Sequence, residues 1–212
     1  MYFHCLGSPS VVRRKLVVVG DRACGKSSLL FVLTNGGLTV PTVFEEYVTE
    51  MNADGTRVEL ALFDTAAQSE YDRIRPLSYP DTHLFLVCFS IDVPDSLESV
   101  LERWVPEVRS FYGGQRHVPV PIILVGCKAD LRADRRVARE LRHSGQVPVT
   151  SEQGIAMQHK IGASAYRECS AKTGEGVNEV FHAVAAAPRR SPTLRPEVTA
   201  VNGIRCRKKN YD

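Results

Sequence analysis

Short apolar runs alternate with amphipathic stretches along most of the chain. Near-continuous apolar runs are typical of strands that are buried on both faces of a parallel sheet. Three runs have this pattern, at Lys15–Val19, Leu84–Ser90 and Ile122–Gly126, and the shorter run Ala165–Cys169 predicts another strand. These segments are far too short to span a membrane, which takes about 18 apolar residues.

Two further stretches, Tyr47–Asn52 and Val58–Asp64, alternate between apolar and polar residues as half-buried strands do. They flank Asp54–Gly55, a dipeptide typical of a tight hairpin. The pair therefore predicts one antiparallel strand at the edge of the sheet.

Helical spacing of apolar residues predicts four helices between the strands, at Lys26–Leu33, Ser96–Tyr112, Ser151–Ile161 and Val177–Ala187. Pro106 should kink or shift the second of them, because proline lacks the amide hydrogen that the helix needs. Alternating strands and helices predict an α/β fold: a six-stranded, mostly parallel sheet with helices on both faces. Ligands of such sheets bind at the carboxyl ends of the strands.

The charge of the chain is unevenly distributed. The 212 residues carry a net charge of +3. Residues 188–212 hold seven basic and two acidic side chains, a net charge of +5, which leaves −2 for the rest. We expect an N-terminal extension (1–13), one globular domain (14–187) and a flexible basic tail (188–212). The mild overall charge argues against nucleic-acid binding.

The six cysteines are sparse and form no CxxC pair. Three of them, Cys88, Cys127 and Cys169, lie in or beside apolar runs, where a free thiol behaves as a small hydrophobic group. The first residues lack the features of a secretory signal. We therefore expect a cytoplasmic protein with reduced thiols.

Residues Gly20–Ser27 have the sequence GDRACGKS, which matches the phosphate-binding pattern GxxxxGK[ST] between a strand and a helix. In such a loop, backbone amides cradle phosphates. Lys26 is predicted to reach the β- and γ-phosphates, and the Ser27 hydroxyl to bind Mg²⁺. Asp64, at the end of a predicted strand, is placed to bind the metal directly or through water. Gln68 is a candidate for orienting an attacking water.

Two motifs predict a guanine site. In GCKAD, which follows the fifth strand, the carboxylate of Asp130 can accept hydrogen bonds from the N1–H and 2-amino groups of guanine, and adenine lacks this pair of donors. The stem of Lys128 can lie along the base. The second motif, ECSAK at Glu168–Lys172, follows the last strand and can close the base pocket.

These segments together resemble the Rho family of Ras-superfamily small GTPases, from about Arg14 to Val184. The resemblance is carried by RKLVVVGDRACGKSSLL, VPTVFEEYV, VELALFDTAAQSEYDRIRPLSYPDTH, CFSIDVPDSLE, VPIILVGCKADLR and YRECSAKTGEGVNEVF. It implies a P-loop NTPase fold, with an extra Rho-type helical segment at about 133–149. It also implies a GTP/GDP switch with Mg²⁺ that hydrolyses GTP and acts in signal transduction and on the actin cytoskeleton.

The resemblance assigns residues to roles. Gln68 would be catalytic, and Ser27, Thr42 and Asp64 (through water) would hold the metal. The nucleotide would be bound by Asp21, Arg22, Ala23, Cys24, Gly25, Lys26, Ser27, Ser28, Thr42, Asp64, Thr65, Ala66, Ala67, Gln68, Cys127, Lys128, Asp130, Ser170, Ala171 and Lys172. Effectors would bind Val40, Pro41, Thr42, Val43, Phe44, Glu45, Glu46 and Tyr47. Expected partners are effectors, exchange factors, GTPase-activating proteins (GAPs) and a dissociation inhibitor, and we expect a monomer.

The chain departs from the family pattern in the predicted nucleotide site and in the approach to switch I. Arg22 replaces a glycine beside the γ-phosphate, where a side chain crowds the catalytic glutamine and the arginine finger of a GAP. Ala67 replaces the glycine of DTAGQ. The approach to switch I, at Asn35–Thr39, is about three residues shorter than the family pattern. Cys127 stands where asparagine is commonest.

The carboxyl end of the chain also departs from the family pattern. Lys209 stands fourth from the end, where Rho proteins usually carry the cysteine of a CaaX box, and Cys206 is seventh from the end. The basic tail alone would give weak, salt-sensitive contact with anionic membranes.

Two other functions compete with the switch. Arg22 and Ala67 also fit a hydrolysis-deficient scaffold that stays bound to GTP, as Rnd-type Rho relatives do. An ATP-dependent P-loop kinase is disfavoured, because no acceptor-substrate domain is evident and the Asp130 motif selects guanine.

Overall fold

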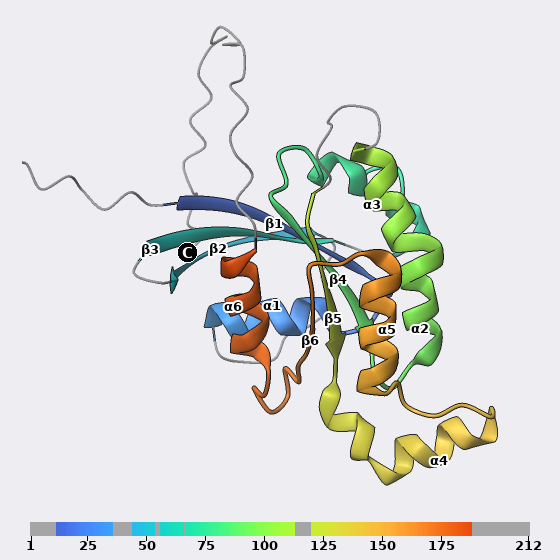
Figure 1. The fold of residues 1–212 in the computed structure, drawn as a ribbon. Helices are drawn as coiled ribbons and strands as arrows, with labels where there is room; N and C mark the ends of the chain where they lie inside the picture. The colour runs from blue at the N-terminus through green and yellow to red at the C-terminus, as the bar shows by residue number, and fades with distance from the viewer. Residues whose placement is uncertain (1–11, 36–43, 54–55, 66, 113–119, 188–212) are drawn as a thin grey trace, which may run out of the picture.

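A computed structural model describes residues 12–35, 44–53, 56–65, 67–112 and 120–187. Six strands form one sheet in the order β2-β3-β1-β4-β5-β6 (Figure 1). The strands are β1 (Val12–Gly20), β2 (Phe44–Ala53), β3 (Thr56–Thr65), β4 (Leu84–Ser90), β5 (Ile122–Cys127) and β6 (Ala165–Glu168). Only β2 runs antiparallel to its neighbour, β3. The predicted α/β sheet with an antiparallel edge strand is confirmed.

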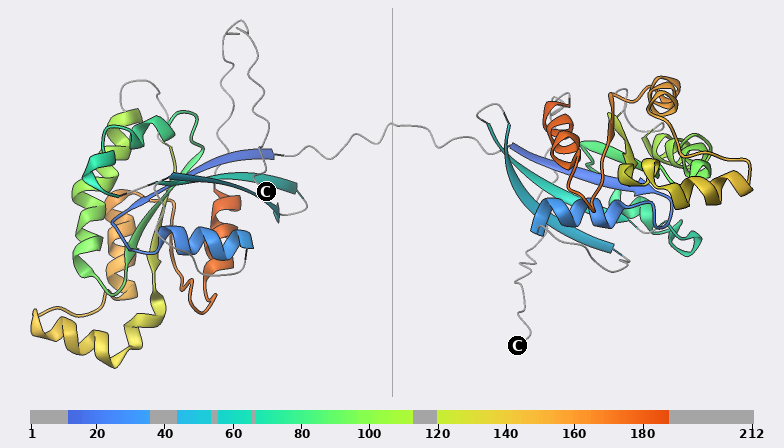
Figure 2. Two further views of the ribbon diagram at one scale, coloured as in Figure 1. Left: turned by 180° about the vertical axis from the view of Figure 1, so that it is seen from behind. Right: turned by 90° about the horizontal axis from the view of Figure 1, so that it is seen from below.

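Helices cover both faces of the sheet, as Figure 2 shows from two further sides. The described α-helices are α1 (Lys26–Asn35), α2 (Pro94–Ser99), α3 (Val105–Tyr112), α4 (Arg135–His143), α5 (Ser151–Ile161) and α6 (Val177–Ala186). Helices α1 and α6 pack on one face, and α2, α3 and α5 pack on the other. No helix in the described ranges has the length and apolar character needed to cross a lipid bilayer.

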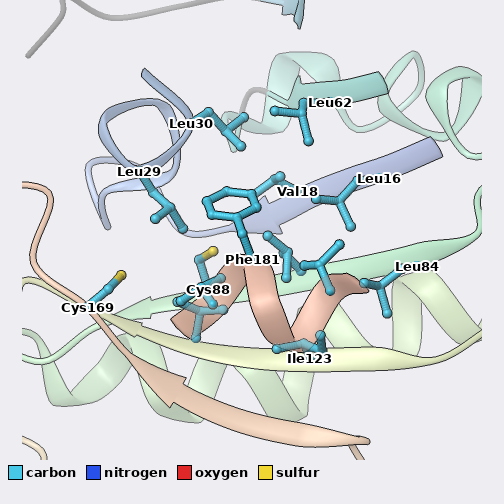
Figure 3. Packing of buried hydrophobic residues seen from close by; sticks show 14 of the residues in the cluster. Leu16, Val18, Leu29, Leu30, Leu62, Leu84, Cys88, Ile123, Cys169 and Phe181 are labelled. Atoms are coloured by element: carbon cyan, nitrogen blue, oxygen red, sulfur yellow. The ribbon is translucent and has the colours of Figure 1, made fainter. Parts of the chain in front are cut away.

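The two faces of β1 bury alternate residues into two separate cores, because successive side chains of a strand point to opposite sides. Leu16 and Val18 pack with α1 and α6, whereas Val17 and Val19 face α2, α3 and α5. Figure 3 shows the ring of Phe181, from α6, within the first core between α1 and the strands. This double burial is why the sequence of β1 is a continuous apolar run.

The helix expected at Ser96–Tyr112 is interrupted where Pro106 predicted a change. A π-helical turn (Val100–Trp104) separates α2 from α3. Proline cannot donate an amide hydrogen bond and its ring crowds the carbonyl four residues earlier, here that of Glu102 within the π turn. The turn directs Arg103 and Trp104 towards the carboxyl edge of β1, as the contacts described below show.

The segment expected to be specific to Rho proteins is helical. A 3₁₀ turn (Ala129–Ala133) leads into α4, whose first turn is capped by Asp134. The Asp134 carboxylate accepts hydrogen bonds from the backbone amides of Arg136, at 2.7 Å, and Val137, at 3.3 Å. Two short 3₁₀ turns, Ser69–Tyr71 and Arg75–Ser78, were not predicted.

The ends of the described chain are close to the expected domain limits. Strand β1 begins at Val12, two residues before the expected start at 14, and α6 ends at Ala186. The guanidinium of Arg14 donates hydrogen bonds to the carbonyl oxygens of Val184, at 2.9 Å, and Ala187, at 3.1 Å. These bonds fix the end of α6 to β1. Residues 1–11 and 188–212 lie outside the described ranges, so the extension and the tail stay predictions.

Candidate functional site

The loop between β1 and α1 depends on two glycines. Gly20 has a φ of +147°, and a Cβ atom on it would lie 2.1 Å from the carbonyl oxygen of Cys88. Gly25 has a φ of +113°, and its Cβ atom would lie 3.0 Å from the Cβ of Cys127. Other residues rarely adopt these conformations, and here they would also clash. The loop therefore lies tightly against the ends of β4 and β5.

Lys26 begins α1 and turns its ammonium group back over this loop. Its Nζ donates hydrogen bonds to the carbonyl oxygens of Gly20, at 2.8 Å, and Asp21, at 2.7 Å. The residue is only 7% exposed. The amino end of α1 adds the positive end of the helix dipole. Positive charge is thus concentrated where the sequence predicted phosphates.

Ser27 and Asp64 meet across the gap between α1 and β3. The Ser27 hydroxyl donates a hydrogen bond to Oδ2 of Asp64, which is only 2% exposed. A hydroxyl and a carboxylate are the hard oxygen ligands that Mg²⁺ prefers, so the residues present fit this ion. The third predicted ligand, Thr42, lies outside the described residues. In the described part of the chain no group of three or more His, Cys, Asp or Glu side chains could hold a metal. Such a set is not required, because Mg²⁺ usually keeps waters and phosphate oxygens as ligands.

The two predicted guanine motifs lie side by side at the ends of β5 and β6. The Ser170 hydroxyl donates a hydrogen bond to Oδ1 of Asp130 at 2.7 Å, and Nζ of Lys172 lies 3.9 Å from Oδ2. The carboxylate is therefore oriented from one side by a fully buried serine. Lys128 adopts a left-handed conformation with φ 60°. Its Nζ lies 3.4 Å from the Asp92 carboxylate.

Backbone bonds join the same two motifs. The amide of Ala129 donates to the carbonyl oxygen of Cys169 at 3.0 Å, and the amide of Cys169 donates to that of Gly126 at 2.9 Å. Cys127 lies between these bonds and is 2% exposed. It packs beneath the P-loop instead of lining an open pocket.

The described cysteines are Cys24, Cys88, Cys127 and Cys169, and all four are buried free thiols. Burial raises the pKa of Cys24 to about 12, so this P-loop thiol stays protonated at neutral pH. None of these four cysteines forms a disulfide in the structure, and the reduced state of the thiols stays a prediction.

Two non-glycine residues at the site have left-handed backbone, a conformation that is costly and that clusters at functional sites. They are Ala23, with φ 57° in the P-loop, and Lys128 in the base motif. Asp81 is the third such residue in the described ranges, and it lies outside this site. Arg22 does not have a left-handed backbone, so its side chain is accommodated without this backbone strain.

Comparisons with known proteins agree with this geometry. The Ras family model matches residues 15–189. The GTP-binding protein RHO1 of Saccharomyces cerevisiae is 58% identical over 179 residues, which are 83% of this chain and 83% of that protein. The chain is 52% identical to the GTP-binding protein rho1 of Schizosaccharomyces pombe over 200 residues, 92% of this chain and 96% of that one. It is 54% identical to the GTP-binding protein RHO1 of Candida albicans over 188 residues, 87% and 92% of the two chains.

The chain is a Rho GTPase of the Ras family.

The resemblance to this family places switch II of the Rho GTPase at Ala66–Pro76. Two arginines bind the backbone of the part of switch II that the structure describes. The Arg75 guanidinium donates to the carbonyl oxygen of Gln68, and that of Arg103 donates to the carbonyl oxygen of Ala67, each at 3.1 Å. Both arginines also bind Oδ1 of Asp72, at 2.6 Å and 2.9 Å. The backbone of the proposed catalytic glutamine is therefore fixed from the π turn and from the following 3₁₀ turn.

Arg75 is the anchor of this network, since it is fully buried. Its Nη1 lies 3.0 Å and 2.8 Å from the two carboxylate oxygens of Glu107, and the Tyr79 hydroxyl donates to the same carboxylate at 2.5 Å. Burial alone would lower the pKa of Arg75, but the hydrogen bonds to Asp72 and Glu107 outweigh it and raise the pKa. The guanidinium is therefore charged at every physiological pH.

Trp104 connects this network to the P-loop. Its indole Nε1 donates a hydrogen bond to Oδ1 of Asp21 at 2.8 Å. The guanidinium carbons of Arg103 and Arg75 lie 4.5 Å and 5.0 Å from the centroid of the ring, within the range of cation–π attraction. The P-loop and switch II of the Rho GTPase thus share one buried aromatic residue.

Several predicted site residues fall outside what the structure describes. Thr42, Ala66 and the effector residues Val40–Val43 are among them, and of Phe44–Tyr47 only the backbone is described, as the start of β2 opposite Leu62–Thr65. Conversely, sequence reasoning did not find Arg75, Trp104 or Glu107. The network joins three separate segments, so no motif with a fixed spacing in the sequence predicts it. The only signal was Pro106, which predicted that the neighbouring helix is irregular.

Proposed function

We propose that this Rho GTPase is a molecular switch that binds GTP and GDP with Mg²⁺ and hydrolyses GTP. The observation that carries the proposal is the meeting of four predicted elements at the carboxyl edge of the sheet. They are the P-loop, the Ser27–Asp64 pair, the switch II glutamine and the two guanine motifs. The GTP-binding relatives at 52–58% identity support the same assignment.

Each residue has a defined task in this proposal. Lys26 and the P-loop amides bind the β- and γ-phosphates. Ser27, Thr42 and, through water, Asp64 hold the metal, which supplies neutralisation of the charge that develops on the phosphates. Gln68 orients the attacking water, and its backbone is fixed by Arg75 as described above.

The base is selected by Asp130. A carboxylate oriented by Ser170 can accept two hydrogen bonds from guanine, at N1–H and at the 2-amino group. Adenine offers neither donor at these positions, so its binding would leave the carboxylate without a hydrogen bond from the base. Lys128 and Lys172 flank the same pocket and would contribute their stems and charges.

Nucleotide content and affinity test this proposal directly. We expect the purified full chain to release GDP or GTP on denaturation, and to bind GDP with Mg²⁺ at micromolar or tighter affinity in calorimetry. Asp130→Ala should weaken GDP binding about 100-fold or more, because it removes hydrogen bonds to a charged acceptor. Glu175→Ala is the matched control, since this exposed carboxylate lies next to the same motif. Failure to bind either nucleotide would refute the proposal.

A second candidate is a scaffold that stays bound to GTP because it hydrolyses it too slowly. The exposed Arg22 side chain in the P-loop favours this candidate, since it would stand beside the γ-phosphate. Single-turnover hydrolysis with and without a Rho GAP distinguishes the two. Strong acceleration supports the switch, and none supports the scaffold.

Partners and location follow from the family and from charge. Effectors would bind at residues 40–47, with exchange factors, GAPs and a dissociation inhibitor as regulators of a monomer. The protein would be cytoplasmic. The basic residues of 188–212 would add weak contact with anionic membranes, at about 1 kcal/mol per basic residue near the surface.

A further inference from the structure

A row of arginines runs along one face of α4. Arg135, Arg139 and Arg142 are spaced four and three residues apart, so they lie on the same side of the helix. All three are exposed. With the partly buried Ala138 they line a shallow hollow of about 320 Å³. We call these three residues the arginine row.

The arginine row is not neutralised within the described part of the chain. The two carboxylates closest in sequence are engaged elsewhere: Asp134 caps the helix, and Glu140 faces Arg136 at 3.9 Å. No ion pair in the described ranges involves a member of the row. Three like charges within about 10 Å of helix repel one another, a cost that an anionic partner would remove.

Hydrogen bonds anchor the chain on both sides of helix α4. At its start the Arg132 guanidinium binds both carboxylate oxygens of Glu168, at 2.6 Å and 2.7 Å. After its end, Gln146 Nε2 donates to Asp95 at 2.6 Å, and the amide of Val149 donates to the carbonyl oxygen of Ile91 at 3.0 Å. A surface fixed at both ends loses little conformational entropy when it binds.

The arginine row and the start of the basic tail lie at opposite ends of the strands. Helix α4 follows the carboxyl end of β5, whereas α6 ends at the opposite edge of the sheet, where residues 188–212 begin (Figure 1). A flat membrane near the start of the tail would therefore not meet α4. Moreover, no apolar side chain on α4 is exposed. A helix that inserts into a lipid surface needs such side chains.

We propose that the arginine row docks an acidic helix of a partner protein. Carboxylates spaced three and four residues apart on that helix match the spacing of the row, and each can take a forked pair of hydrogen bonds from a guanidinium. The small side chain of Ala138 leaves room between the arginines for the carboxylates.

The test uses the full chain and a labelled alanine-based helical peptide with glutamates on one face, followed by fluorescence anisotropy. We expect binding that weakens as the salt concentration rises from about 50 to 300 mM. The triple variant R135Q/R139Q/R142Q should bind about tenfold more weakly or worse. Glutamine and arginine have similar helix propensity, so the fold should be kept. The single reversal R139E gives a second test should the triple variant fold poorly.

A matched control, R136Q/K160Q/R167Q, removes three exposed charges outside the arginine row, one of them on α4 itself, and should leave binding unchanged. A peptide with glutamine in place of glutamate should not bind. Any of three results would overturn the proposal. The control variant could lose as much affinity for the acidic peptide as the triple variant, the two peptides could bind equally well, or the acidic peptide could fail to bind. It would also be overturned if vesicles rich in phosphatidylserine, or duplex DNA, bound more tightly than the peptide and depended on the same three arginines.

Discussion

Trp104 and Asp21 are joined by a hydrogen bond of 2.8 Å between the indole nitrogen and the carboxylate. The bond reaches from the π turn ahead of α3 to the second residue of the P-loop. Pro106, two residues beyond the tryptophan, is a physical reason for that turn, since it prevents a regular helix. An irregularity in a covering helix thus helps to position the phosphate-binding loop.

Removing this bond should loosen the P-loop with little loss of packing. Trp104→Phe keeps an aromatic ring but leaves Asp21 without its indole donor. We expect the free energy of unfolding to fall by about 1 to 3 kcal/mol, from the lost hydrogen bond and the smaller ring, and the release of labelled GDP to become faster. Urea denaturation and stopped-flow exchange measure the two effects. Phe111→Leu, on the more distant end of α3, is the control, and the idea fails if both variants release GDP at the same rate.

The buried Arg75 should be the most sensitive residue of switch II. Arg75→Met removes the positive charge and leaves Glu107 without its ion-pair partner, while Asp72 keeps only Arg103. Breaking a buried ion pair from one side costs about 3–5 kcal/mol, which chemical denaturation would detect. Arg73→Met is a matched control, because Arg73 is exposed in the same segment. Comparable stability of the two variants would contradict this role.

The Glu168–Arg132 pair should make stability depend on acid. Burial alone would raise the pKa of Glu168, but hydrogen bonds from Arg132 and Tyr166 outweigh it and lower the pKa below the ordinary value. A lowered pKa in the folded state means that this contribution is complete above the unfolded-state pKa of about 4.3 and is lost as the pH falls through the folded-state value.

Glu168→Gln should therefore flatten the loss of stability below about pH 4.3. At neutral pH it should cost about 1–3 kcal/mol, because a charge-assisted pair becomes a neutral one. Thermal unfolding across a pH series checks both effects. The exposed Glu140→Gln is the control, and identical pH profiles of the two variants would rule out the assignment.

Arg22 should limit the response to a GAP. Its side chain stands beside the expected γ-phosphate position, where the arginine finger of a GAP must enter. Arg22→Gly should raise GAP-stimulated hydrolysis by about 10³-fold or more, within the range that an arginine finger supplies. Single-turnover assays at saturating GAP measure this. The steric argument is wrong if the rate is unchanged while Arg22→Gly still binds GTP.

Much of the fold could be predicted because the signals are local. The run Lys15–Val19 is apolar throughout since both of its faces are buried, and Ser151–Ile161 begins and ends where its capping box and Gly162 place it. The P-loop, Asp64 and Asp130 were found because their motifs follow strand ends that the topology brings to one edge.

The switch II network could not be predicted for the opposite reason. Arg75, Glu107 and Trp104 carry no motif of their own, and a buried arginine contradicts the usual exposure of that residue type. The partners of Arg75 come from separate segments, among them Glu107 of α3, whose approach depends on the packing of the second core. The left-handed backbone of Ala23 and Lys128 was equally hidden, since neither residue type favours it.

The chain contains a single tryptophan, and it is the residue that touches the P-loop. All indole emission of the protein therefore originates within one hydrogen bond of the phosphate-binding loop, with two guanidinium groups near the ring. The intrinsic fluorescence of the unlabelled protein is a built-in optical reporter of the loop, and it could follow nucleotide exchange in real time.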